Sequence, residues 1–217
     1  TVSLDSLTFT PANWSTPQTV TVTGVDDVIQ DGSVAYTVQL SSESSTDTNF
    51  NGLAVDDVSV TNTDDDIAGI SVVPTSGLIT TEAGGTDSFD ILLNTQPTAD
   101  VTIDISSSDT SEGTVSPSSL TFTNLNWSTA QTVTVTGVDD SFDDGNVSYT
   151  IITAAATSAD SNYSGKDPSD VSVTNSNDDT AGVTVTPTSG LLTTEAGGTD
   201  TFTVVLDTQP TADVTID

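Results

Sequence analysis

Apolar and polar residues alternate with a period of two along many stretches of this chain. Because successive side chains of a β-strand point to opposite faces, such alternation indicates strands with one buried face. The clearest cases are Val20 and Val22, Phe89, Ile91 and Leu93, Val101, Ile103 and Ile105, and Val133 and Val135. No stretch repeats its apolar residues with the period of an amphipathic helix. The pattern therefore predicts an all-β protein.

Turn-forming residues interrupt these stretches at short intervals, and Thr, Ser and Val dominate between the turns. Such a composition is typical of antiparallel β-sandwiches. Over residues 67–179 the pattern predicts seven strands, near 70–74, 86–94, 101–106, 119–123, 131–136, 147–154 and 170–175. The expected fold is a seven-stranded antiparallel β-sandwich.

The chain contains an internal repeat, and one copy of it is called a module below. Residues 1–104 recur at 114–217 without insertion or deletion, and 67 of the 104 aligned pairs are identical. The period of 113 residues exceeds the roughly 20–50 residues of solenoid repeats and matches a common domain size, roughly 100–150 residues. We therefore expect tandem sandwiches. Residues 1–66 supply the last four strands of one module, 67–179 a complete module, and 180–217 the first three strands of the next.

Acidic residues dominate the charge, with 32 Asp and Glu against one Lys, which gives a formal charge of −31. Nucleic acid and anionic membrane surfaces are excluded as partners, because binding them requires Lys and Arg. No run approaches the roughly 18 apolar residues of a membrane span, so membrane insertion is not expected. The chain has no Cys and no His, so it lacks disulfides and the usual nucleophile and general base of enzymes. We expect no enzymatic activity.

Acidic residues gather in particular turns of the module. Because successive strands run in opposite directions, the first, third and fifth turns and the exit from the last strand should share one end. These segments hold Glu82, Asp109, Glu112, Asp139, Asp140, Asp143, Asp144, Asn177, Asp178 and Asp179. The equivalent residues of the part modules are Asp26, Asp27, Asp31, Asp64, Asp65, Asp66 and Glu195.

So many carboxylates at one end would repel one another without a counter-charge. At roughly 4 Å and an effective dielectric constant of roughly 20, each like pair costs about 4 kcal/mol before screening. Oxygen donors without His or Cys favour calcium or magnesium, and a loop-built site of flexible oxygens favours Ca²⁺. The alternative is that these residues only solvate the surface.

At these residues the module resembles the Calx-beta family of calcium-binding domains. The matching segments are 81–85 (TEAGG), 108–115 (SDTSEGTV), 136–140 (TGVDD) and 177–182 (NDDTAG). The resemblance covers the whole module and implies an Ig-like β-sandwich. It implies calcium ligands at Glu82, Asp109, Asp139, Asp140, Asp143, Asp178 and Asp179, with Asn177 in place of a terminal Asp. Because the other copy has Asp64 for Asn177 and Gln30 for Asp143, we expect calcium affinity to differ between copies.

Near-identical tandem modules of this composition also resemble the extender regions of giant repeats-in-toxin (RTX) adhesins of Gram-negative bacteria. This resemblance implies an extracellular position at the cell surface and a part in adhesion and biofilms. Only residues 180–182 separate the complete module from the strand that follows, so calcium at the acidic end would stiffen the joint. We expect a calcium-rigidified spacer. The alternative is a calcium-dependent module that binds carbohydrate or protein. The stretch in which the copies differ most, 41–50 against 154–163, has only Phe50 and Tyr163 as aromatic residues, which does not favour it.

The two part modules predict self-association. Each leaves an apolar face and strand edges without a partner, and such edges pair readily. We expect residues 180–217 of one molecule to complete residues 1–66 of another. The composite would combine Glu195 with the acidic residues of 1–66 but lack a counterpart of Asp109, so weaker calcium binding is expected there.

Overall fold

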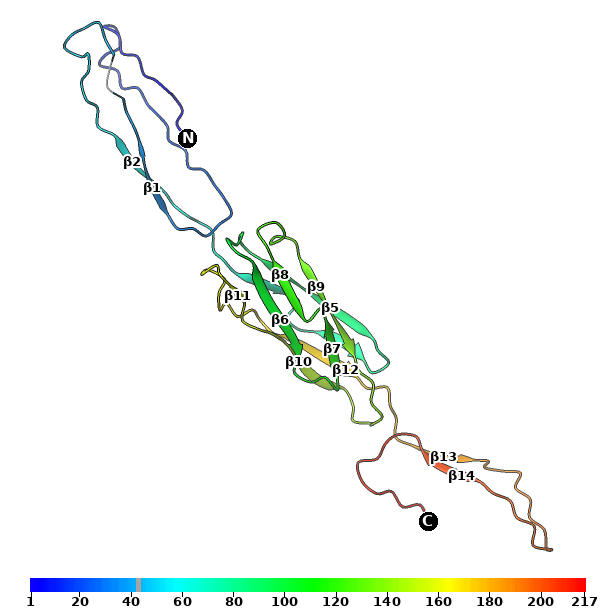
Figure 1. Ribbon diagram of the computed structural model, residues 1–217. Helices are drawn as coiled ribbons and strands as arrows, with labels where there is room; N and C mark the ends of the chain where they lie inside the picture. Colours follow the sequence, from blue (N-terminus) through cyan, green and yellow to red (C-terminus); the bar gives the residue numbers. More distant parts are fainter. Residues whose placement is uncertain (42–43) are drawn as a thin grey trace. The chain divides into compact units, whose positions relative to one another are not determined.

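The structure is a computed structural model that describes residues 1–41 and 44–217. It divides into two compact units, Thr1–Ala68 and Gly69–Asp217. All the regular structure in the described ranges is β, in 14 strands (Figure 1). The all-β prediction is therefore confirmed. The division of the chain into three modules stays a prediction.

The first sheet of the complete module has four strands. They are β3 (Ile70–Val73), β5 (Thr86–Leu93), β9 (Gln131–Gly137) and β7 (Gly113–Ser116), in that order across the sheet. All three pairings are antiparallel. The alternating residues Phe89, Ile91, Val133 and Val135 are buried on its inner face, as the period of two requires.

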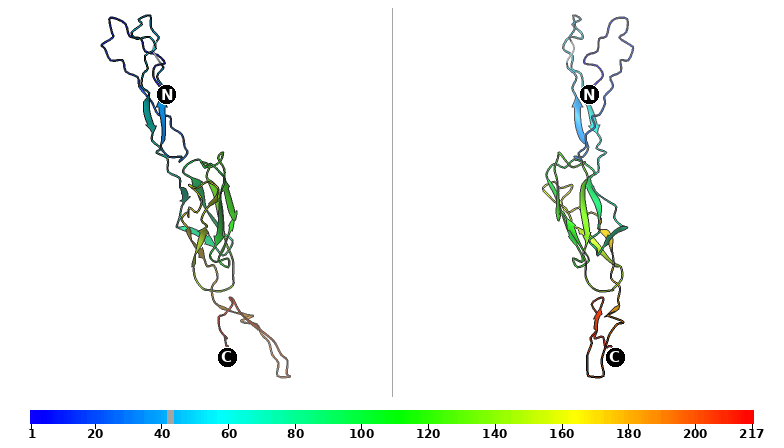
Figure 2. Two further views of the ribbon diagram at one scale, coloured as in Figure 1. Left: turned by 60° about the vertical axis from the view of Figure 1, so that its left-hand side comes forward. Right: turned by 90° about the vertical axis from the view of Figure 1, so that its right-hand side faces the viewer.

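The second sheet supplies the other half of the core. Its order is β11 (Thr157–Ser158), β6 (Val101–Ser107), β10 (Val147–Thr153), β12 (Val171–Ser176) and β4 (Leu78–Thr81), with β8 (Ser119–Phe122) paired to β6. Figure 2 shows the long strands of both sheets running along the module. The buried residues of this sheet include Val101, Ile103, Phe122, Ile151 and Val171.

All seven predicted strands of the complete module are present, and β4, β7 and β11 were not predicted. Pro74 follows β3 directly, and Pro117 follows β7. Proline has no N–H and interrupts a strand ladder. The chain therefore changes sheets at each point, β3 and β7 joining the first sheet and β4 and β8 the second. The chain keeps its direction across each proline, so the ends assigned to the turns are unaffected.

The unit Thr1–Ala68 forms only part of a sandwich. Its strands β1 (Val34–Val38) and β2 (Val58–Asn62) pair antiparallel in the register of β10 and β12. The strands expected at the counterparts of β8 and β9 are not formed in the described part of this unit. In the complete module these strands pair with β5 and β6, which have no counterparts within residues 1–68, and with β7, whose counterpart at residues 1–3 forms only the bridge between Val2 and Val22.

Residues 180–217 also form only some of the strands expected for their part of the module. Strands β13 (Val183–Thr186) and β14 (Thr203–Leu206) pair in the register of β3 and β5. The third strand expected there, the counterpart of β6 near 214–217, is not formed in this described segment. In the complete module β6 pairs with β8, β10 and β11. Each part module thus forms only strands whose partners it contains.

Replacing Tyr163 with Phe should destabilise the complete module. Tyr163 is fully buried in the loop after β11, and its hydroxyl donates to the Thr95 carbonyl (2.7 Å) and accepts from the Thr95 N–H (3.1 Å). Without that hydroxyl the buried Thr95 backbone loses its partner, and such a loss costs about 1–3 kcal/mol of unfolding free energy. Urea unfolding followed by circular dichroism measures the change.

The matched control for this prediction lies in the other copy of the repeat. Phe50 occupies the equivalent position and is exposed, so Phe50→Tyr should leave the unfolding free energy unchanged within about 0.5 kcal/mol. Equal losses in the two variants would show that the Thr95 contacts contribute nothing specific.

Candidate metal centre

The predicted acidic segments meet at one end of the complete module. Asp178, in the exit segment, donates its N–H to Glu82 Oε2 in the first turn at 3.1 Å. Asn177, beside it, donates its side-chain amide to Asp143 Oδ1 in the fifth turn at 3.3 Å. Three segments far apart in the sequence therefore contact one another directly. We refer to this region as the acidic end.

Glu112 brings the third turn to the same place. Its carbonyl accepts the N–H of Val138, which opens the fifth turn, at 3.0 Å. One carboxylate oxygen each of Glu112, Asp140 and Asp144 lies within 4.8 Å of the other two. Glu112 is buried, Asp140 half-buried and Asp144 exposed. The three carboxylates therefore surround a common point that opens to solvent on the Asp144 side.

The ligand set implied by the family resemblance left out Glu112, although the strand pattern placed it at this end. Its side chain accepts a hydrogen bond from Asn175 Nδ2 at 3.4 Å. Asn175 is itself buried and also donates to the Val138 carbonyl at 3.0 Å. Its position in the third turn, which the strand pattern assigned to this end, was the signal available in the sequence.

Asp179 provides a test of whether a cation fits this end. Its Oδ2 atom is buried and has no hydrogen-bond partner among the described residues. Burial raises the pKa of Asp179, and the carboxylates of Asp178, Asp139, Asp140 and Asp143 raise it further. A buried, unpartnered carboxylate oxygen carries a large desolvation cost. A hard cation shared with these neighbours would remove that cost, so the residues present fit calcium or magnesium.

The ionised forms of Glu82 and Glu112, deeper in the module, are also disfavoured. Both side chains are almost fully buried. Burial raises the pKa of Glu82, and Asp140, Asp144 and Asp178 raise it further, although the Asp178 N–H opposes them. Burial likewise raises the pKa of Glu112, with added repulsion from Asp144, Asp109 and Asp140 against the hydrogen bond from Asn175. The Asp140 carboxylate raises the pKa of both groups and that of Asp179. It is therefore the charge that these three carboxyl groups share.

Asp109 is placed differently from the other acidic residues. Its Oδ1 atom accepts hydrogen bonds from the Ser111 N–H, at 3.0 Å, and from the Ser111 hydroxyl. These bonds lower the pKa of Asp109. The Oδ1 atom of Asp109 is therefore already used in hydrogen bonds within the third turn. If Asp109 is a calcium ligand, as predicted, its Oδ2 atom would bind the ion.

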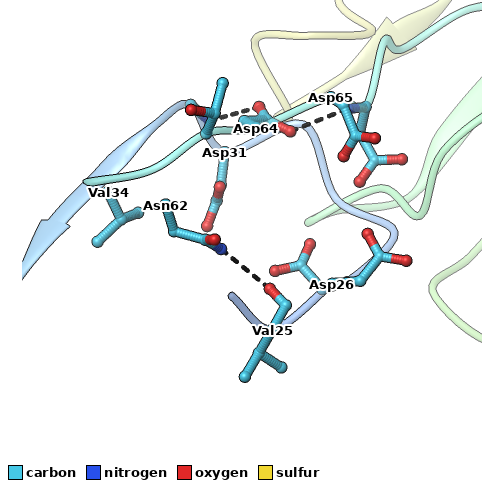
Figure 3. A pocket seen from close by; sticks show the side chains of 11 residues that line it. Val25, Asp26, Asp31, Val34, Asn62, Asp64 and Asp65 are labelled. Atoms are coloured by element: carbon cyan, nitrogen blue, oxygen red, sulfur yellow. Dashed lines mark hydrogen bonds between the residues drawn. The ribbon is translucent and has the colours of Figure 1, made fainter. Parts of the chain in front are cut away.

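The unit Thr1–Ala68 holds the equivalent segments of its own module. Figure 3 shows Asp26, Asp31 and Asn62 converging on one space, and Asn62 Nδ2 donates to the Val25 carbonyl at 2.9 Å. Asp64 Oδ2 accepts the Gly32 N–H at 2.7 Å. The remaining acidic residues lining this pocket are Asp27, Asp65 and Asp66. The predicted fifth-turn and exit residues of this copy therefore lie together.

The two copies place their acidic residues differently at this end. Burial raises the pKa of Asp66, and Asp64, Asp65, Asp26 and Asp27 add to the effect. Residue 30 is Gln where the complete module has Asp143. Glu195, the counterpart of Glu82, is exposed in the turn closed by the bridge between Thr194 and Gly198.

A hydrogen bond ties each linker to the fifth turn. The Ala181 N–H donates to Asp143 Oδ2 at 2.8 Å. In the other copy the Ala68 N–H donates to Gln30 Oε1 at 2.7 Å. Gln30 thus keeps the acceptor oxygen of Asp143 and loses only its charge. The position serves the linker in both copies, which the sequence comparison alone did not indicate.

Comparisons with known proteins give only distant likenesses. No protein-family model and no curated protein matches the chain. The chain is similar to the solved apo-form Calx CBD1 domain, at 11% identity over 52% of this chain and 100% of that chain, with a TM-score of 0.41. It is similar to domains 4 and 5 of the S-layer protein SbsC, at 20% identity over 56% and 58%, with a TM-score of 0.32. At these TM-scores the likenesses carry no weight for function.

Lowering the pH from 7 to about 5 should stabilise the calcium-free complete module. The pKa values of Glu82 and Glu112 are raised on folding, first by burial and then by neighbouring carboxylates. The folded state therefore binds protons more readily than the unfolded chain. The penalty is full above the raised values and shrinks as the pH falls towards the unfolded value of about 4.3. Melting temperatures of calcium-free protein across this range measure the effect.

Below about pH 4 the trend should reverse, because other carboxylates have lowered pKa values. Asp109 is one of them. Asp160 is another, since hydrogen bonds from Thr98 and Asn162 outweigh the opposing effect of its burial. Their stabilisation is present above the unfolded pKa and is lost as the pH falls through the folded value. Glu112→Gln should flatten the rise between pH 7 and 5, and a melting temperature that falls steadily from pH 7 would contradict the prediction.

Proposed function

We propose that this chain is a calcium-rigidified spacer segment of a large cell-surface adhesin, which projects a distal ligand-binding region away from the cell. The observation that carries the proposal is the hydrogen bond from Ala181 to Asp143. It joins the linker to the loop that holds Asp139, Asp140 and Asp144. A cation that orders this loop would therefore also order the linker to the next module.

The acidic end offers two groups of donors for calcium. One consists of Glu112, Asp140 and Asp144, whose oxygens surround a common point, with Glu82 beside them. The other is centred on the unpartnered Asp179 oxygen and includes Asp139, Asp143 and Asp178. Bound calcium would supply the positive charge that these carboxylates lack within the chain. We expect two or more ions per complete module, countable by calorimetric titration.

The module is built to be joined end to end. Strand β4 follows the first strand, β3, and pairs in parallel with the last strand, β12. The chain therefore enters at one end of the module and leaves at the other. Strand β5 has eight residues, which at about 3.3 Å per residue gives a strand about 26 Å long. Each module would add at least that length to a rod.

We place the protein at the cell surface. No helix in the described part of the chain has the length and apolar character needed to cross a membrane. The strongly negative charge keeps such surfaces soluble and apart from one another. A secreted repeat region of a larger adhesin fits this charge.

Direct binding of carbohydrate or protein is the alternative, and one observation weighs against it. Tyr163, the aromatic residue of the complete module in the stretch where the copies differ most, is buried against Thr95. Its hydroxyl is used in the core, so it presents no ring to a ligand. A glycan array probed with this chain in calcium would test the alternative.

Small-angle scattering with and without calcium tests the spacer proposal. At low protein concentration, we expect the chain to have a sharper distance distribution in about 1 mM calcium than in EGTA, where the joints lose their counter-charge. Asp143→Ala should broaden the distribution even in calcium, because the Ala181 N–H loses its acceptor. Asp104→Ala, an exposed position on β6, is the matched control. Identical distributions in calcium and EGTA would refute the proposal.

A further inference from the structure

A chain of buried polar side chains runs from the core of the complete module to Glu112. The Tyr149 hydroxyl lies 3.3 Å from Thr80 Oγ1, which donates to Asn175 Oδ1 at 3.0 Å. Asn175 Nδ2 in turn donates to Glu112 Oε2 at 3.4 Å. Thr80 and Asn175 are fully buried, and Tyr149 and Glu112 are almost fully buried. Polar groups from three strands and one turn are therefore connected inside the sandwich.

The direction of each hydrogen bond in this chain is defined. Asn175 Nδ2 also donates to the Val138 carbonyl at 3.0 Å, so the amide nitrogen faces the acidic end and the amide oxygen faces Thr80. The Thr80 hydroxyl has one proton and donates it to Asn175, so it accepts a hydrogen bond from the Tyr149 hydroxyl. Every group thus donates towards Glu112. Hydrogen bonds aligned in this way polarise and strengthen one another.

Two glycines leave the space that these polar groups occupy. A Cβ atom at Gly113 would overlap the Tyr149 hydroxyl. A Cβ atom at Gly137 would overlap the side-chain oxygen of Asn175 and the carbonyl of Thr81. Neither glycine has a φ angle in the left-handed region, so the absence of a side chain matters here for space and not for backbone conformation. The strands therefore approach one another in a way that fits these polar groups.

The other copy of the repeat holds the same asparagine in the same orientation. Asn62 is the counterpart of Asn175, and its Nδ2 atom donates to the Val25 carbonyl at 2.9 Å. A Cβ atom at Gly24, the counterpart of Gly137, would overlap the Asn62 side-chain oxygen. The orientation of this amide is therefore a property of the module, repeated in both copies.

We propose that Asn175, held in place by Thr80 and Tyr149, is a positioning residue that aims the Glu112 carboxylate at a cation bound in the acidic end. This inference rests on the proposed calcium function and gives a role to residues that are not ligands. Glu112 is the most deeply buried of the three carboxylates that surround a common point. The hydrogen bond from Asn175 favours its ionised form. Hydrogen-bond partners behind a metal ligand orient it and contribute to affinity.

Calorimetric titration of the full chain with calcium tests this role. Thr80→Val removes the hydroxyl that orients the Asn175 amide and changes no carboxylate. We expect the site that uses Glu112 to lose about tenfold in calcium affinity, the lower end of what loss of such a partner costs, while sites without Glu112 keep theirs. Thr80→Ser keeps the hydroxyl and should bind calcium as the natural chain does.

Thr153→Val is the matched control. Thr153 is buried like Thr80, and its hydroxyl donates to the Ser169 carbonyl at 3.0 Å. It is the last residue of β10, a strand that begins just after the fifth turn, so it lies away from the acidic end. Both Thr→Val variants should be less stable than the natural chain in EGTA, and only Thr80→Val should lose calcium affinity. Equal calcium affinities in the two variants would overturn the positioning role.

A measurement without calcium separates this inference from the calcium proposal. In EGTA, NMR spectra should show the side-chain amide protons of Asn175 shifted downfield and protected from exchange, because they donate to a buried carboxylate and a carbonyl. Glu112→Gln should move one of them upfield, since its acceptor loses its charge. Ordinary shifts with fast exchange in the natural chain would overturn the inference, even if calcium binds. Shifted, protected protons in a natural chain that binds no calcium would instead refute the proposed function, and the positioning role with it.

Discussion

Removing calcium should lower the melting temperature of the complete module by about 20 °C. At a calcium concentration 100 times the dissociation constant, each site adds about 2.7 kcal/mol to the stability of the folded state. Two sites would contribute about 5 kcal/mol, and for a domain of roughly 100 residues each kcal/mol shifts the melting temperature by about 4–8 °C. Differential scanning calorimetry in 1 mM calcium and in EGTA measures the shift.

The physical source of this effect is the repulsion that remains when calcium is removed. Glu82 and Glu112 are almost fully buried, and one oxygen of Asp179 has no partner among the described residues. The chain holds a single Lys against 32 acidic residues, so it cannot supply the counter-charge itself. Magnesium is the control ion, and we expect a smaller shift because it prefers a tighter octahedral site. Equal melting temperatures in calcium and EGTA would show that the acidic end needs no cation.

The strands were predictable because the core is built from one repeated rule. Residues such as Phe89, Ile91, Val133 and Val135 are buried at every second position, and that period is visible in the sequence. Strands β4 and β7 were missed because each has only four residues and is separated by a proline from a predicted strand, β3 or β8, that belongs to the other sheet. The alternation of apolar and polar residues indicates only which face of a strand is buried. It does not indicate which sheet the strand joins.

Much of the acidic end was also predictable, because alternating strand directions decide which turns share an end. The contact between Asp178 and Glu82 follows from that rule. The bond from Ala181 to Asp143 does not, because it depends on the path of three linker residues. The exchange of Asp143 for Gln30 looked like a lost ligand in the sequence, whereas the structure shows that it preserves a hydrogen-bond acceptor.

Replacing Asp140 with Asn should have opposite effects on stability in the presence and absence of calcium. In EGTA the variant should melt at a higher temperature, because one of the charges that act on Glu82, Glu112 and Asp179 is gone. The gain should be on the order of 1 kcal/mol after screening. In calcium the variant should be less stable than the natural chain, because a tenfold loss of affinity corresponds to about 1.4 kcal/mol.

Asn is the informative substitution because it removes the charge and keeps the local structure. Asp140 Oδ1 accepts the Phe142 N–H at 2.7 Å, and the carbonyl oxygen of Asn can accept the same bond. Asp104→Asn, on the exposed face of β6, should change the melting temperature little under either condition. A purely structural role for Asp140 predicts the same sign of change with and without calcium. A role in solvation alone predicts almost no change, so the reversal of sign separates cation binding from both.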